Sequence, residues 1–156
     1  MIRARALTAD AFAPWGDVLE ATGNHRLINA GMCRRFHDRA RPDVAGGLVG
    51  LSVFEAEPRA LPYALDRVER HPLGSQAFLP MTGNPFLVVL AEDGEAPGPV
   101  HAFVTSGAQG VNIRRGAWHG VLAPLQARGL FAVLDYVGDA PNLQEHRFPA
   151  SLTITG

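Results

Sequence analysis

Four side chains that could bind a metal ion or move a proton lie in two short stretches of the sequence, residues 69–76 and residues 118–119. Glu69 and His71 are two residues apart, so both point to one face if this segment is a strand. The turn-forming string Pro72-Leu73-Gly74 follows, and Gln76 opens the next apolar run. His119 comes much later in the chain, directly after Trp118. If neighbouring strands curl around a common interior, these four groups form one site.

The donor types of this set allow two kinds of chemistry. Carboxylate, amide and imidazole groups together suit a divalent transition metal such as nickel, manganese, iron or zinc. The same groups could act without a metal, as a general acid and a general base. A simpler alternative is that Glu69 pairs with Arg67 or Arg70 at the surface, and that His71 and His119 are unrelated. Spacing alone leaves these interpretations open.

A second polar segment covers residues 29–38. On a strand, Arg35 and His37 share a face, and Arg34 or Arg35 could hold a carboxylate. His37 and Asp38 could form a proton-relay pair. The alternative is a solvated edge strand with local pairing between arginine and aspartate.

A third polar segment leads up to Trp118-His119. Asn112, Arg114 and Trp118 alternate on one face if the segment is extended, and Arg115 then faces the other way unless Gly116 breaks the phase. Amide, guanidinium, indole and imidazole groups packed together indicate a polar pocket. The alternative is a surface hairpin in which Trp118 belongs to the core.

The composition limits the class of protein that could carry these motifs. The chain has 156 residues, of which 47% are hydrophobic and 19% charged, so we expect one globular domain over residues 1–156. The net charge of −1 and the lack of a basic block argue against nucleic acid as a partner. No apolar run is long enough to span a membrane, and we expect a cytoplasmic protein without a membrane partner.

Two absences in the composition narrow the chemistry further. All 14 basic residues are arginines, which excludes a lysine Schiff base and leaves arginine as the clamp for an anionic substrate. Cys33 is the single cysteine, so neither an intramolecular disulfide nor a multi-cysteine zinc site can form.

Short segments between prolines and glycines predict an all-β domain, either a barrel or a sandwich. Helical signal is weak and predicts one short helix over residues 8–15, with Thr8 as its N-cap, and a second near residues 142–145. The predicted strands are Gly47 to Phe54, Gln76 to Pro80, Phe86 to Ala91, Val100 to Thr105 and Leu130 to Val137.

Several of these motifs resemble the ureidoglycolate lyase family, also called ureidoglycolate hydrolase. The string Glu69-Arg-His-Pro-Leu-Gly-Ser-Gln-Ala-Phe78 is similar to the family's, as are Gln109-Gly-Val-Asn112 and Trp118-His119. The opening Phe12-Ala-Pro-Trp-Gly-Asp-Val18 also matches, as does Arg35-Phe36-His37-Asp38. The resemblance covers most of the chain.

This resemblance implies a cupin-type, jelly-roll-like β-barrel and a defined reaction. It implies cleavage of (S)-ureidoglycolate to glyoxylate and urea, in the breakdown of allantoin and purine nitrogen. We expect His119, with His71 or Glu69, to supply the acid and base. Around them, we expect substrate contacts from Arg115 or Arg35, Asn112, Gln76 and Trp118.

The resemblance also bears on the cofactor and on oligomeric state. Cupins commonly bind metal through His-x-His, a following Glu and a distant His, and here Glu69, His71, Gln76 and His119 fit that order with two substitutions. A weakly held Ni²⁺ or another divalent metal is therefore expected, and no organic cofactor. Cupin barrels usually pair as homodimers, so we expect a homodimer. Tyr136 departs from relatives, which often carry arginine there.

Two alternative functions fit the same barrel. One is another cupin enzyme, such as a sugar isomerase or a metal-dependent dioxygenase acting on a small acid. The other is a non-catalytic small-acid sensor, which would bind its ligand without consuming it.

Overall fold

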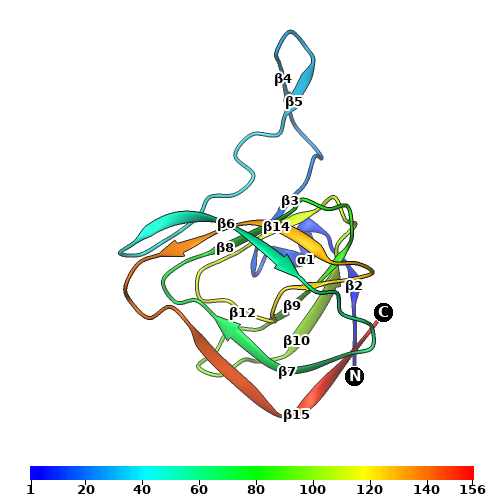
Figure 1. The fold of residues 1–156 in the computed structure, drawn as a ribbon, viewed down its shortest axis with the longest axis vertical. Coiled ribbons are helices and arrows are strands. Elements are labelled where there is room, and N and C mark those ends of the chain that lie inside the picture. The colour runs from blue at the N-terminus through cyan, green and yellow to red at the C-terminus, as the bar shows by residue number, and fades with distance from the viewer.

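The computed structural model of residues 1–156 is built almost entirely from strands, which form two main sheets and one hairpin (Figure 1). The eight-stranded sheet has the order β1-β15-β7-β12-β9-β10-β2, with β13 paired to β9. Its strands are β1 (Ile2–Arg3), β15 (Gln144–Thr155), β7 (Tyr63–Arg70), β12 (Trp118–His119), β9 (Phe86–Ala91), β10 (Val100–Val104), β2 (Arg5–Ala6) and β13 (Ala123–Pro124). The all-β barrel expected from the sequence is therefore confirmed.

The five-stranded sheet has the order β3-β11-β8-β14-β6 and lies against the larger sheet. Its strands are β3 (Gly16–Leu19), β11 (Gly110–Ile113), β8 (Gln76–Pro80), β14 (Gly129–Val137) and β6 (Leu48–Ala56). The two remaining strands, β4 (Arg26–Ile28) and β5 (Cys33–Arg35), pair only with each other.

Strand β9 lies at the centre of the molecule, because both of its faces are buried. Phe86, Val88 and Leu90 point into the interior shared by the two sheets, where residues of β8, β11 and β14 meet them. The alternate residues Leu87 and Val89 point to the other side, into a second apolar cluster covered by β15 and the N-terminal segment. The fully apolar run of β9 follows from this two-sided burial.

The sequence located the long apolar strands well. The predicted runs Gln76 to Pro80 and Phe86 to Ala91 coincide with β8 and β9. The other three differ from β6, β10 and β14 by one or two residues at their ends. Strands rich in charge or only two residues long, such as β7 and β12, were not among the predicted strands.

One of the two predicted helices is confirmed and the other is wrong. Helix α1 (Ala9–Phe12) begins after Thr8, whose hydroxyl accepts a hydrogen bond from the backbone N–H of Ala11. Residues 142–145 are not helical, because Gln144 already begins β15 and pairs with Arg70 of β7. No helix has the length and apolar character that crossing a membrane would require.

A long arm connects β3 to β6 and stands away from the barrel (Figure 1). The arm consists of residues 21–42 and carries the β4–β5 hairpin near its tip. The chain rejoins the barrel at Asp43, whose backbone N–H and carbonyl both bind Ser75. Val44 then pairs with Gly74.

Candidate active site

Strand register brings Glu69 and His119 side by side. His119 lies directly opposite Glu69 of β7 on one side and opposite Leu90 of β9 on the other. Directly paired residues of antiparallel strands point to the same face, and Leu90 points into the interior between the sheets. Glu69 and His119 therefore face that interior, and His71 follows at the end of β7.

The three side chains form a compact cluster. One ligand atom from each of Glu69, His71 and His119 lies within 4.8 Å of the others. The Nε2 atom of His71 is 3.8 Å from a carboxylate oxygen of Glu69, and the two imidazole rings have centroids 5.2 Å apart. The surface-pairing alternative for Glu69 is thus wrong, since the two histidines are its neighbours.

Backbone carbonyls orient both imidazole rings. Nδ1 of His71 lies 2.8 Å from the carbonyl oxygen of Asn142, and Nδ1 of His119 lies 3.0 Å from that of Gly120. A carbonyl can only accept, so each Nδ1 carries the proton and each neutral ring presents a lone pair at Nε2. Both Nε2 atoms are buried without a hydrogen-bond partner. Two unshared acceptors thus point toward one carboxylate.

Burial changes the protonation of this cluster. Burial lowers the pKa of His119 to about 4, so its imidazole is neutral near pH 7. Burial also raises the pKa of Glu69, partly opposed by the nearby His71 and aided by Glu145. A neutral imidazole suits a metal ligand or hydrogen-bond acceptor better than an acid, and a raised carboxyl pKa suits proton transfer.

The five-stranded sheet contributes a second polar pair to the same interior. Gln76 shares its face of β8 with Phe78, and Asp135 shares its face of β14 with Val133, both of which belong to the interior core. Nε2 of Gln76 donates to the Asp135 carboxylate at 3.1 Å, while Oε1 of Gln76 is buried without a partner. Asp135 therefore fixes the amide so that its oxygen is free to accept a hydrogen bond.

The structure does not bring every predicted contact residue to this interior. Trp118 points to the opposite side of the eight-stranded sheet, where the Arg70 guanidinium lies 4.3 Å from its ring centroid. Asn112 points away from the interior core and donates to Asp17 at 3.1 Å. The alternation proposed for residues 112–118 fails because β11 ends at Ile113 and a turn follows.

The two candidate arginines lie in different parts of the molecule. Arg115 belongs to the turn after β11, where the neighbouring Gly116 donates its N–H to the carbonyl of His71. Its guanidinium pairs with Asp43 at 3.3 Å and is partly exposed. Arg35 lies on the arm, opposite Arg26 in the β4–β5 hairpin, and makes no contact with the cluster.

The sequence motifs did not single out Asp135 or Asn142 as residues of the site. The signal for Asp135 was available, since it follows Phe131 and Val133 at the period of a strand and should share their buried face. Asn142 had no comparable signal, because it acts through the main chain of a loop. Its carbonyl accepts from His71, and its side-chain oxygen accepts from the N–H of Leu73 at 2.7 Å.

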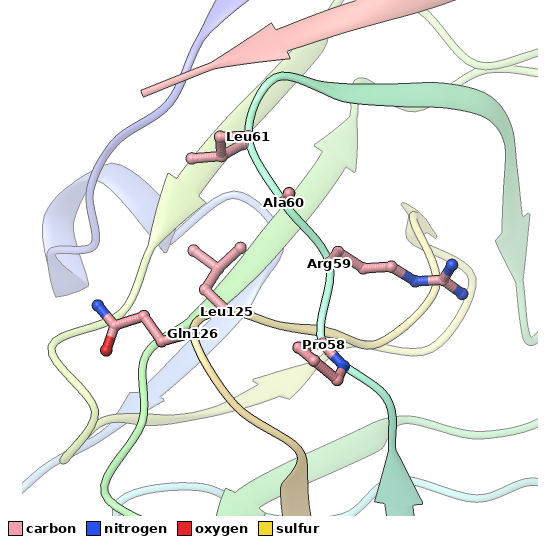
Figure 2. A pocket seen from close by; sticks show the side chains of 6 residues that line it. All are labelled: Pro58, Arg59, Ala60, Leu61, Leu125 and Gln126. Atoms are coloured by element: carbon pink, nitrogen blue, oxygen red, sulfur yellow. The ribbon is translucent and has the colours of Figure 1, made fainter.

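A separate pocket lies at the other end of β7 (Figure 2). It has a volume of about 490 Å³ and lies between the β6–β7 connection and the residues after β13. Glu69 is near the end of β7 and this pocket is near its start, so the pocket is not part of the cluster. It is lined by Pro58, Arg59, Ala60, Leu61, Leu125 and Gln126.

Comparison with known proteins identifies the family. The family model described as ureidoglycolate lyase matches residues 1–155. The chain belongs to the ureidoglycolate lyase family. It is 56% identical to the ureidoglycolate lyase of Rhodobacter capsulatus, over 96% of this chain and 95% of that protein. It is 49% identical to ureidoglycolate lyase 2 of Rhizobium meliloti, over 92% of this chain and 91% of that one.

Among solved structures, the chain aligns with NovW, a 4-keto-6-deoxy sugar epimerase of Streptomyces spheroides. The alignment covers 94% of this chain and 73% of NovW, with 17% identity and a TM-score of 0.49. The family membership itself rests on the sequence relatives, which span nearly the whole chain.

The cluster fits the divalent metal that the ureidoglycolate lyase resemblance implies. Two imidazoles with unshared Nε2 atoms and one carboxylate lie close enough to share an ion. Both rings are oriented through Nδ1, the arrangement usual for histidine ligands of metals. Three donors of mixed nitrogen and oxygen type suit a borderline divalent ion and leave coordination positions for substrate.

Proposed function

We propose that this member of the ureidoglycolate lyase family cleaves (S)-ureidoglycolate to glyoxylate and urea. We further propose that residues 1–156 act as a single cytoplasmic domain. The family membership supports the reaction, and one observation supports its location. This observation is the cluster of Glu69, His71 and His119, with two unshared imidazole nitrogens facing a carboxylate inside the barrel.

The reaction needs one proton moved from oxygen to nitrogen. The substrate carries a hydroxyl and a ureido nitrogen on the same carbon, next to a carboxylate. When the hydroxyl proton leaves, the carbon–oxygen double bond of glyoxylate forms and the carbon–nitrogen bond breaks. The departing nitrogen takes up a proton and becomes urea. No nucleophile is required, so the lack of an activated serine or cysteine is consistent with this chemistry.

Glu69 is our candidate for the group that moves the proton. Burial raises its pKa toward the working pH, which makes it a better proton acceptor and, once protonated, a good donor. It accepts the hydroxyl proton and delivers it to the ureido nitrogen. His119, whose pKa of about 4 leaves its ring uncharged near pH 7, has no imidazolium proton to give and instead accepts hydrogen bonds or binds a cation.

Two other groups hold the ends of the substrate. The free Oε1 of Gln76 accepts from the ureido N–H groups, with Asp135 preventing the amide from turning. Arg115 binds the carboxylate at the edge of the site, and Asp43 keeps the guanidinium in place. Arg35 of the same chain is not part of this clamp, since the arm carries it away from the barrel.

Glu69, His71 and His119 would hold the divalent metal through one ligand atom each, with Ni²⁺ as our first choice, which leaves the second carboxylate oxygen of Glu69 to move the proton. A bound cation supplies positive charge to the hydroxyl and carboxylate oxygens of the substrate and so favours loss of the hydroxyl proton.

One assay tests the proposed reaction and its metal dependence. Racemic ureidoglycolate is incubated with the protein, and glyoxylate and urea are measured over time. We expect equimolar glyoxylate and urea from about half of the substrate, because one enantiomer reacts. Chelation should lower the rate, and added nickel should restore it. Binding without consumption would instead identify a small-acid sensor, and a rate unaffected by chelation would remove the metal from the account.

A further inference from the structure

Backbone hydrogen bonds hold the walls of the pocket at the start of β7. The connection between β6 and β7 runs beside the segment after β13, where the N–H of Arg59 donates to the carbonyl of Pro124 at 2.8 Å. Arg59 also forms a parallel bridge with Leu125, whose own N–H donates to the carbonyl of Pro85 at 2.9 Å. We expect this hollow to exist before any ligand enters it, because its two walls are tied to each other and to the barrel.

This hollow, which we call the Leu125 pocket, is apolar where it is deepest. Leu125 is 8% exposed, and Leu61 packs against the same apolar cluster. Pro58 and Ala60 are exposed at its rim, and none of the lining residues is acidic. Its volume of about 490 Å³ falls within the range of small-molecule sites, roughly 300–1,000 Å³. The pocket therefore suits the apolar part of a small molecule.

A polar pocket adjoins the Leu125 pocket at Arg59. It has a volume of about 310 Å³, and we call it the Arg67 pocket. Figure 2 shows the Arg59 guanidinium extending away from Leu61 and Leu125, to the other side of the β6–β7 connection. The guanidinium therefore lies toward the polar pocket, while the apolar floor lies behind it. The Arg67 pocket is lined by Arg59, Tyr63, Ala64, Asp66, Arg67 and Val121.

Arg59 is the cation of these pockets that has no counter-ion. Arg67 pairs with Asp66 at 3.4 Å and with Glu145 at 3.3 Å. The other ion pairs made by arginines of the chain do not involve Arg59 either. A guanidinium binds a carboxylate through two parallel hydrogen bonds. One free guanidinium balances one negative charge, which favours a monocarboxylate over a phosphate group that carries nearly two.

We propose that the Leu125 and Arg67 pockets together form a second ligand site, which binds a monocarboxylate with an apolar chain. The chain fills the Leu125 pocket, and the carboxylate pairs with Arg59 where the two pockets meet. The site is separate from the metal-type cluster, because Tyr63 at the start of β7 is six residues before Glu69, about 20 Å along the strand.

A chain-length series tests the ligand class. Butyrate, hexanoate and octanoate are titrated into the protein by calorimetry, and each added CH₂ group should tighten binding about fourfold. Octanamide has the same chain without the charge, and it should bind roughly fivefold more weakly than octanoate. Equal affinity for butyrate and octanoate would overturn the apolar pocket, and equal affinity for octanoate and octanamide would overturn the role of Arg59.

Two substitutions locate the site. Ala60→Trp fills the Leu125 pocket from an exposed position and should abolish octanoate binding, whereas Ala108→Trp, at an exposed alanine outside both pockets, should not. Arg59→Gln should bind octanoate and octanamide alike. Its control is Arg3→Gln, since Arg3 is exposed and lines neither pocket, and this variant should keep the preference for octanoate. Octanoate binding to Ala60→Trp with wild-type affinity would contradict the proposal.

Competition separates this site from the proposed reaction. Glyoxylate in excess should leave the affinity for octanoate unchanged, because the two molecules would occupy different sites. Displacement of octanoate by glyoxylate would instead place octanoate at the Glu69 cluster and overturn the second site. None of these measurements depends on turnover, so the second site and the ureidoglycolate reaction can fail independently of each other.

Discussion

A buried neutral imidazole links the site to the stability of the protein. The pKa of His119 is about 4 in the folded chain, against an ordinary value of 6.5, because burial disfavours the charged ring. Between these two values, the unfolded chain binds a proton that the folded chain does not. The free energy of unfolding therefore rises with pH across this window. The contribution of the neutral His119 to the free energy of unfolding is fully present above about pH 6.5 and is lost as the pH falls toward 4.

This dependence can be measured by urea unfolding of chelator-treated protein at pH 7 and pH 5. The free energy of unfolding of the wild type should fall by roughly 2 kcal/mol more than that of His119→Gln over this interval. His25→Gln, which changes an exposed ring on the arm, should keep the wild-type dependence. Equal pH dependence in wild type and His119→Gln would show that His119 titrates normally.

The sequence predicted the members of the Glu69–His71–His119 cluster better than the residues expected around them. Glu69 and His71 were placed on one face by their spacing, and the structure confirms that His119 joins them. Asn112 and Trp118 were misplaced because the alternation assumed for them needs one continuous strand, whereas a turn separates them at Gly116. The Asn142 carbonyl, which orients His71, has no side-chain pattern from which to predict it.

The pairing of β3 with β11 depends on a glycine. Gly16 lies opposite Ile113 with a φ of +152°, and a Cβ built there would stand 1.8 Å from the carbonyl oxygen of Asn112. No side chain can relieve that overlap, because the obstructing atom belongs to the backbone. β3 must move away from β11 if any larger residue replaces Gly16.

Gly16→Ala should therefore lower the free energy of unfolding by more than about 2 kcal/mol, because the added methyl group overpacks a position next to backbone that cannot easily move. Gly83→Ala is the control, because a Cβ at Gly83 would meet no atom within 4 Å. Thermal or urea unfolding of the two variants measures the difference. A Gly16→Ala protein as stable as Gly83→Ala would show that β3 is not held closely against β11.

Elements differ in how far the sequence reveals them. The central strands β8 and β9 were predicted to the residue, since a short, continuous apolar run bounded by turns is typical of a buried strand. Strand β7 contains both acidic and basic residues, so no apolar run marks it as a strand. Its place in the sheet follows from its pairing with β12 and β15. The wrong helix at residues 142–145 has the same origin, because pairing to β7 overrides local preference.

For the whole molecule, the site exists only because two sheets enclose one interior. The eight-stranded sheet supplies Glu69 and His119, and the five-stranded sheet supplies Gln76 and Asp135. The short strands predicted an all-β barrel or sandwich, and the family resemblance implied a cupin-type barrel. Neither the sequence nor the resemblance indicated the arm that projects from the barrel (Figure 1). In the sequence β4 and β5 look like any other polar hairpin, and only the structure shows that they pair with no other strand.

In the proposed reaction, the Glu69–His71–His119 cluster performs the cleavage, with Glu69 moving the proton. Its most direct test is kcat/KM for glyoxylate release from ureidoglycolate, measured at saturating nickel for Glu69→Gln and Glu145→Gln. These carboxylates lie directly opposite each other on β7 and β15, but only Glu69 belongs to the cluster. Glu69→Gln should lose about 10²–10⁴-fold in kcat/KM, while Glu145→Gln, which removes only a neighbouring charge that helps raise the pKa of Glu69, should lose far less. Near wild-type kcat/KM in Glu69→Gln would contradict the account.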